Sequence, residues 1–231
     1  LGGDSIAACF VEPIAGSTGC LVPPVGYLER LREICDAHGI LLVFDEVICG
    51  FGRTGTPFAA ETFSVTPDII TMAKGITNGA QPMGAVAVRD GIYETVMESA
   101  APGAIELFHG YTYSGHPAAC AASLAVLDIY EKEGVFTNAA TMAPYFQDAI
   151  FGMKDISGIS DIRGYGMLAG IDLSPEGGAG ARGMKIHKKL FSSGVYIKFT
   201  GDTALVAPPL VSTKENIDEI ISGIKRVLED G

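Results

Sequence analysis

The sequence predicts an α/β protein, with a domain at residues 1–152 built on a mainly parallel sheet and a smaller α+β domain at residues 153–231. Two observations support this fold class. In the first part, apolar runs that suit buried strands alternate with helical stretches, and strand, helix and strand joined by short links imply parallel pairing. From about residue 153 this alternation stops, which indicates a second packing unit.

The opening elements form one strand–helix–strand unit. Residues 6–11 are a continuous apolar run, typical of a strand buried on both faces. A helix is expected between Pro24 and Gly39, because apolar residues recur there at helical spacing and a glycine closes the stretch. Residues 40–44 are again entirely apolar, so they predict a second buried strand.

The remaining elements follow from the same patterns. In the first domain we expect strands at 67–73 and 84–88 and helices at 117–132 and 137–151. In the second domain we expect strands at 159–164, 167–173, 195–198 and 204–207, and helices at 180–193 and from about Thr213 onward. Thr213 is the expected N-cap of the last helix, whose aliphatic residues fall on one stripe.

Composition and charge exclude several classes of function. Of the 231 residues, 48% are hydrophobic and 19% charged, which is a globular composition. The formal net charge of −11 argues against a nucleic-acid partner, because phosphate binding needs a basic face. We also expect no membrane partner, since no apolar run could cross a bilayer and no polybasic stretch is present.

The five cysteines are scattered and form no CxxC pair, so we expect neither a disulfide framework nor a metal site. A reducing, cytoplasmic location follows from that expectation. The chain opens without methionine and runs at once into an apolar strand. We therefore expect either that the N-terminus was removed or that the chain is a piece of a longer one.

Asp45 and Glu46 end the second predicted strand. Ligands of open parallel sheets lie beyond the carboxyl ends of the strands, so one of these two acids should point into such a crevice and hold a cationic partner. The alternative is an acid that caps a helix or stabilises a loop.

Lys74 ends the strand-like run 69–73 and is flanked by Gly75 and Gly79, which allow a ligand to approach the backbone. It could be an ordinary surface lysine with a buried stem. In an apolar site, however, its pKa would fall and it would become a nucleophile toward an aldehyde. A Schiff-base lysine together with a carboxylate that faces a pyridinium nitrogen is what pyridoxal 5'-phosphate (PLP) requires.

Several motifs in order along the chain resemble the class III PLP-dependent aminotransferases, in particular the ω-amino acid:pyruvate branch. They are Phe44-Asp45-Glu46-Val47-Ile48-Cys49-Gly50-Phe51-Gly52-Arg53-Thr54-Gly55, Lys74-Gly75, Pro82-Met83-Gly84-Ala85, Gly110-Tyr111-Thr112-Tyr113-Ser114-Gly115-His116-Pro117, Arg163-Gly164 and Gly201-Asp202. The resemblance implies the C-terminal portion of a fold type I (aspartate aminotransferase-like) enzyme. Family members are about twice this long, and the half absent here carries their phosphate-binding turn and their ring-stacking aromatic residue.

The resemblance also implies roles for individual residues. Asp45 would bond the pyridine nitrogen, Val47 would pack on one face of the ring, and Lys74 would form the Schiff base. Thr112 resembles a threonine that reaches the cofactor phosphate of the neighbouring subunit, with Tyr111 near the same shared site. The expected assembly is therefore a homodimer with shared active sites.

Three further positions match the family with a less definite role. Glu12 resembles an acid that organises the cofactor pocket, and the alternative is a loop acid bonded to nearby backbone. Lys198 stands where the ω-amino acid:pyruvate branch has an arginine for the substrate carboxylate; lysine keeps the charge but loses the bidentate fork. Its alternative is a solvated lysine on an edge strand. We expect structural roles for Arg53 and His116.

The predicted reaction transfers an amino group from an amine or ω-amino acid to a 2-oxo acid such as pyruvate. The alternatives within the family are a 4-aminobutyrate or ornithine aminotransferase, or an aminomutase. The alternative from another class is a truncated, non-catalytic domain.

Overall fold

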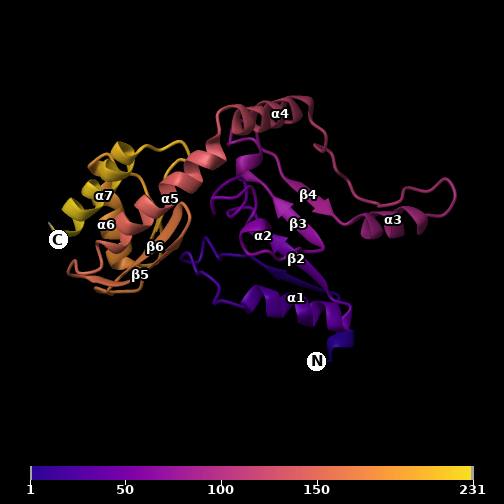
Figure 1. Ribbon diagram of the computed structural model, residues 1–231, viewed down its shortest axis with the longest axis horizontal. Coiled ribbons are helices and arrows are strands. Elements are labelled where there is room, and N and C mark those ends of the chain that lie inside the picture. The colour runs from indigo at the N-terminus through magenta and orange to yellow at the C-terminus, as the bar shows by residue number, and fades with distance from the viewer. Residues whose placement is uncertain (1, 230–231) are drawn as a thin grey trace.

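The computed structural model describes residues 2–229, which fold around two four-stranded sheets (Figure 1). The first sheet has the order β1 (Ala8–Val11), β2 (Leu41–Asp45), β3 (Ile69–Met72) and β4 (Ala85–Val88). The first three strands are parallel and β4 is antiparallel to β3. The predicted α/β class with a mainly parallel sheet is therefore confirmed.

Helix α1 (Tyr27–His38) connects β1 to β2 and packs on the first sheet, where Leu28 and Cys35 meet Leu42 and Phe44. The helix begins after Gly26, three residues later than the proline pair suggested, and it ends at Gly39 in the left-handed conformation, as expected of a helix-terminating glycine. The βαβ unit thus forms as predicted.

One expectation for β1 is wrong. The apolar run was expected to be buried on both faces, yet Phe10 is 73% exposed. Cys9 and Val11 pack in the core formed with α1, so Phe10, between them, points to the opposite face of the sheet, where no described residue buries it. The apolar composition predicted the strand correctly, but it did not predict that one face of the strand is exposed.

The pattern did not predict four short elements, of which the first precedes β1 and the other three follow β2, β3 and β4. They are η1 (Gly3–Ser5), α2 (Ala59–Thr62), η2 (Lys74–Ile76) and α3 (Asp90–Glu98). Next come α4 (Pro117–Lys132), at its predicted bounds, and α5 (Val135–Phe151), which begins two residues earlier than predicted. These two helices lead from the first sheet to the second (Figure 1).

The second sheet is antiparallel and has the order β5 (Ile159–Tyr165), β6 (Leu168–Leu173), β8 (Thr203–Val206) and β7 (Lys198–Thr200). Helix α6 (Ala181–Ser192) precedes β7, and α7 (Lys214–Glu229) closes the chain. Thr213 caps α7 as expected, since its Oγ1 accepts from the Asn216 N–H. β7 starts three residues later than predicted, because the hairpin turn at Gly201 pairs Lys198 with Leu205.

Side chains of the second sheet alternate between two cores. Ala169 and Val206 face a large core formed with α5, α6 and α7, whereas Leu168 and Leu205 face the first half of the chain and pack near Ile14. This second face holds the two halves together. Helix α5 lies before the predicted domain boundary at residue 152, yet it packs in the large core of the second sheet. The boundary therefore stays a prediction.

Candidate active site

The two acids at the end of β2 point to different surroundings. Glu46 is fully buried, and its carboxylate accepts from the N–H groups of Ala59 (2.8 Å) and Ala60 (2.7 Å) at the start of α2. Burial raises the pKa of Glu46, although the hydrogen bonds from these two N–H groups act to lower it. Among the described residues, Asp45 Oδ1 accepts only from the Val47 N–H, at 3.0 Å. Glu46 thus takes the helix-capping role, and Asp45 is the acid left at the carboxyl end of the sheet.

Lys74 follows β3 directly and adopts a left-handed backbone conformation, with a φ of +48°. Gly75 is required next to it: a Cβ atom there would lie 2.6 Å from the Cβ of Phe51. The tight turn therefore presents Lys74 at the same edge of the first sheet at which β2 ends.

A cavity of about 580 Å³ lies between the two halves of the chain, and it brings Val47, Lys74 and Lys198 together. The strand ends of the first sheet supply Val47 and Lys74, and β7 of the second sheet supplies Lys198. Arg53 is the third cation of the lining, and no Asp or Glu belongs to the described part of it. In a chain with a net charge of −11, this lining favours an anionic ligand.

Arg53 links the two halves beside this cavity. Its Nη1 donates to Met167 O (2.9 Å) and Pro208 O (2.6 Å), and its own carbonyl accepts from the Met167 N–H at 2.9 Å. Burial lowers the pKa of Arg53 to about 10. These bonds are what a structural role requires, and they also hold the cavity walls at a set spacing.

The loop at residues 16–20 closes another side of the cavity through Gly16 and Ser17. Arg163 Nε donates to Gly19 O at 2.7 Å, and Thr200 Oγ1 donates to Ser17 O at 2.8 Å. Asp172 holds the Arg163 guanidinium through two hydrogen bonds, of 2.8 and 2.9 Å. Because these partners lie 144 and 183 residues apart in the chain, no local pattern indicated them.

Glu12 does not line this cavity. Its Oε2 accepts from the Gly16 N–H at 3.0 Å, which is the loop contact named as its alternative. Its effect on the cavity passes through that loop.

Thr112, Tyr111 and His116 lie in a separate hollow, together with residues 82–84 and the start of α4. Tyr111 has a φ of +43°, and its ring stacks on His109 with the centroids 3.9 Å apart. Neither Tyr111 nor Thr112 lines the Lys74 cavity within this chain.

Sequence reasoning missed Tyr130, which lies on α4 and lines the Lys74 cavity. Its hydroxyl donates to Gly75 O at 2.7 Å. The residue occupies an ordinary position of a helix, so no signal in the sequence set it apart.

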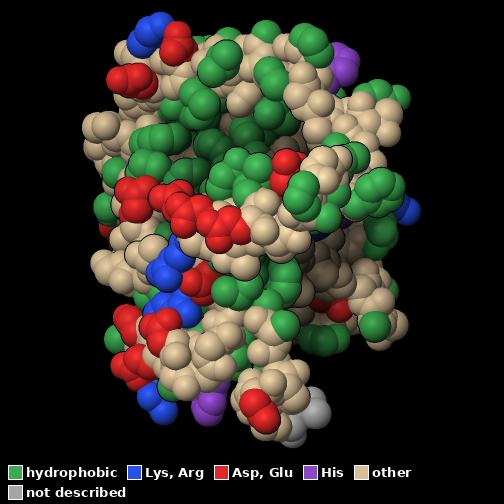
Figure 2. All heavy atoms as spheres, turned by 90° about the vertical axis from the view of Figure 1, so that its right-hand side faces the viewer, with side chains coloured by type: hydrophobic (Ala, Val, Ile, Leu, Met, Phe, Trp, Pro, Cys, Tyr) green, Lys and Arg blue, Asp and Glu red, His purple; other side chains and the backbone are tan. Residues whose placement is uncertain are grey.

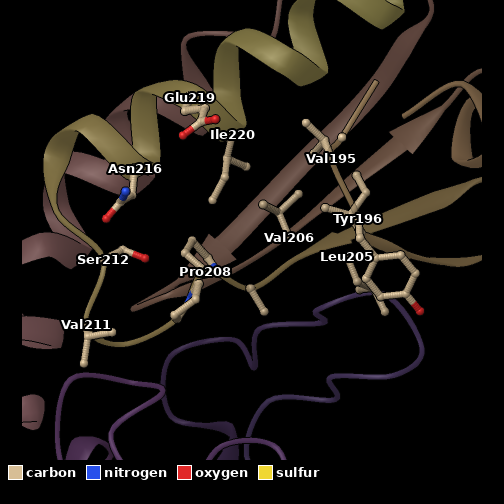
Figure 3. A pocket seen from close by; sticks show the side chains of 14 residues that line it. Val195, Tyr196, Leu205, Val206, Pro208, Val211, Ser212, Asn216, Glu219 and Ile220 are labelled. Carbon is tan, nitrogen blue, oxygen red and sulfur yellow. The ribbon is translucent and has the colours of Figure 1, made fainter. Parts of the chain in front are cut away.

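A second cavity, of about 590 Å³, lies between α7 and the segment 205–212 (Figure 3). It shares Leu205, Ala207, Pro209 and Val211 with the lining of the Lys74 cavity. Glu219 is the one carboxylate of its described lining, and no lysine or histidine accompanies it. Lysine and arginine side chains therefore line the Lys74 cavity and not this one.

Residues 2–229 contain neither a metal-binding cluster nor a membrane-spanning helix. No cluster of three His, Cys, Asp or Glu side chains is placed to hold a metal ion. No helix in this range is both long and apolar enough to traverse a bilayer.

The fold and the cavity define an α/β protein with a cation-lined site between a mainly parallel sheet and an antiparallel sheet. The sequence profile of the family "Aminotransferase class-III" matches residues 1–228, and the chain belongs to this family. It is 55% identical over 226 residues to an omega-aminotransferase of Caulobacter vibrioides and 48% identical to an omega-amino acid–pyruvate aminotransferase of Pseudomonas putida. Each alignment covers 97% of this chain, and 51% and 50% of these relatives respectively.

Solved transaminase structures share the fold. The omega transaminase from Pseudomonas jessenii in complex with PMP has a TM-score of 0.94 and 34% identity, over 99% of this chain and 52% of that one. The predicted fold type I architecture is confirmed by these neighbours. The chain spans about half the length of the curated relatives it matches.

Proposed function

We propose that this chain supplies the lysine-bearing part of a PLP-dependent transaminase. The reaction would move an amino group from an amine or ω-amino acid to a 2-oxo acid such as pyruvate. The observation that carries the proposal is the single cavity lined by Val47, Lys74 and Lys198. The relatives support it, since one is named for transfer between ω-amino acids and pyruvate.

The residues present fit the cofactor. When bound, PLP supplies an aldehyde for an amine and a ring that accepts electrons. Lys74 would attach it and Val47 would pack on the ring, since both line the cavity. Asp45 ends β2 two residues before Val47 and is not itself part of the lining; it would face the pyridine nitrogen. Asp45 suits that role because Glu46 is committed to α2. The described lining has three cations and no carboxylate, so it would attract both the cofactor phosphate and the carboxylate of a substrate.

Lys198 would bind the substrate carboxylate. It lines the same cavity as Lys74 but belongs to the second sheet, so the two ends of an ω-amino acid could meet different walls. No ion pair joins Lys198 to a carboxylate in the described part of the chain, and this charge is available to a ligand.

The working unit would be a homodimer in which Thr112 and Tyr111 serve the partner's site. The segment that bears them extends away from the sheets with α3 (Figure 1) and exposes several large apolar side chains, Phe108 at 92%. Figure 2 shows hydrophobic side chains gathered on this side of the molecule. Such a surface favours burial against a second copy.

Borohydride reduction with PLP tests the proposal in the protein expressed from its complete coding sequence. The reduced label should map to Lys74, and Lys74→Ala should abolish it. Lys132→Ala is the matched control, because Lys132 is an exposed lysine paired with Asp128. A label on another lysine, or none in the unaltered protein, would contradict the proposal; the second outcome would favour a non-catalytic domain.

A further inference from the structure

The Lys74 turn has few contacts that hold its shape. Lys74 lies in a region of backbone space that residues other than glycine rarely adopt. The short helix η2 that follows is closed by long bonds, with Thr77 N to Lys74 O and Asn78 N to Gly75 O both at 3.3 Å. A turn of this kind persists only where its surroundings determine it.

Inside the turn, Thr77 Oγ1 donates to Gln81 O at 2.6 Å. Among the described residues, Tyr130 provides the one hydrogen bond that reaches this turn from another element. Its hydroxyl donates to Gly75 O at 2.7 Å, across 55 residues of sequence. The ring is fixed by two aromatic neighbours, with centroid distances of 4.9 Å to Phe136 and 6.1 Å to Phe51. Phe51 also contacts the backbone of Gly75 closely enough to exclude a side chain there.

We propose that Tyr130 is a positioning residue that holds the Lys74 turn and thereby keeps the amine directed into the cavity. It acts through the carbonyl of Gly75, the residue next to Lys74. Both Tyr130 and Lys74 line the cavity, so the hydrogen bond lies at the wall where the cofactor would attach. The inference rests on the proposed function, because its effect is measured as the rate of PLP attachment to Lys74.

The phenol is suited to donate this bond at neutral pH. Burial raises the pKa of Tyr130, and the charge of Arg53 opposes that effect only in part. The hydroxyl therefore keeps its proton over the physiological range, and the bond to Gly75 O persists there.

Tyr130→Phe tests the inference, with Tyr145→Phe as the matched control. Tyr145 also donates one phenol hydrogen bond from a helix, to Asp218 Oδ1 at 2.6 Å. In the protein from the complete coding sequence, we would measure amide exchange of residues 74–81 without PLP. We would also measure the rate at which PLP becomes reducible onto Lys74, and the thermal midpoint. Tyr130→Phe should speed that exchange and slow that attachment by about threefold to tenfold each, as the loss of one hydrogen bond predicts.

The outcomes separate this inference from the proposed function. Exchange and attachment at unaltered rates in Tyr130→Phe would overturn the positioning role. Equal changes in Tyr145→Phe, or changes that only follow the thermal midpoint, would overturn it too. An unaltered protein that takes up no label would overturn the proposed function, and the exchange rates would then still decide whether Tyr130 holds the turn.

Discussion

At the residue scale, the neighbouring acids Asp45 and Glu46 have different surroundings and different hydrogen-bond partners. Successive side chains of a strand point to opposite faces, so two acids that end one strand reach different surroundings. Glu46 satisfies two N–H groups of α2 inside the protein. Asp45 accepts one hydrogen bond among the described residues, from the Val47 N–H, and under the proposed function it would be the pyridine partner, which makes it the residue to test.

Asp45→Asn should lower the rate of the amino-transfer half-reaction by about a hundredfold, or about 2.7 kcal/mol of barrier. The amide keeps the size of the side chain but removes the charge that would hold the pyridine nitrogen protonated. Stopped-flow absorbance of the PLP-loaded protein measures this rate. Asp36→Asn, an exposed acid of α1, is the control. A near-normal rate in Asp45→Asn would remove it as the pyridine partner.

Lys198 can be tested by substrate choice. Lys198→Arg should lower the Michaelis constant for an ω-amino acid, because guanidinium binds a carboxylate through a fork and charge-assisted bonds are worth roughly 1.5–3 kcal/mol. Lys198→Ala should raise it. Neither change should affect a simple amine that lacks a carboxylate. Equal effects on both substrates, or no effect on either, would identify Lys198 as an ordinary edge-strand lysine.

At the scale of elements, Asp68 ties the first sheet to α1. Asp68 is 7% exposed, and its carboxylate accepts from the Leu42 N–H at 2.7 Å and from Arg32 at 2.8 Å. Arg89, beyond β4, adds an ion pair at 3.0 Å. Burial alone would raise the pKa of Asp68, but these three partners outweigh it and hold the pKa below its usual value.

Asp68→Asn should therefore destabilise the protein by roughly 1.5–3 kcal/mol, because charged hydrogen bonds are lost and Arg32 keeps only the exposed Asp36 as its partner. The folded-state pKa of Asp68 lies below the unfolded value of about 3.9. Its stabilisation is present above that value and is lost as the pH falls through the folded-state pKa. The free energy of unfolding, measured with urea, should thus decrease less steeply from neutral to acidic pH in Asp68→Asn than in the unaltered protein. Asp128→Asn, which breaks an exposed pair, should change stability by only a few tenths of a kcal/mol.

At the scale of the whole molecule, both sheets contribute to the Lys74 cavity. The segment between α3 and α4, which bears Thr112, extends away from the sheets (Figure 1). The contacts of Arg53 and of the loop at 16–20 set the cavity walls within one chain. Thr112 lies in a different hollow, so an active site that includes it would need a second copy.

Mixed dimers test this arrangement. Lys74→Ala and Thr112→Val proteins should each be impaired alone. Coexpressed, they should regain activity, because a mixed dimer holds one site with Lys74 from one subunit and Thr112 from the other. Activity of the purified mixed dimer measures this. If Thr112 served the Lys74 of its own chain, mixing would restore nothing beyond the average of the two variants.

The sequence by itself determined what depends on local pattern. Apolar runs and their spacing placed the strands of the parallel sheet and most helices. Strand ends placed Asp45 and Lys74 at one edge, because parallel strands align their carboxyl ends. The motifs then identified the family that the comparisons show. Tertiary structure decided the rest: which acid of the pair caps α2, the exposure of Phe10, the Arg53 bridge and the hydrogen bond from Tyr130 to Gly75. Such contacts join residues far apart in the chain, and their formation depends on how elements pack, which hydrophobic periodicity does not encode.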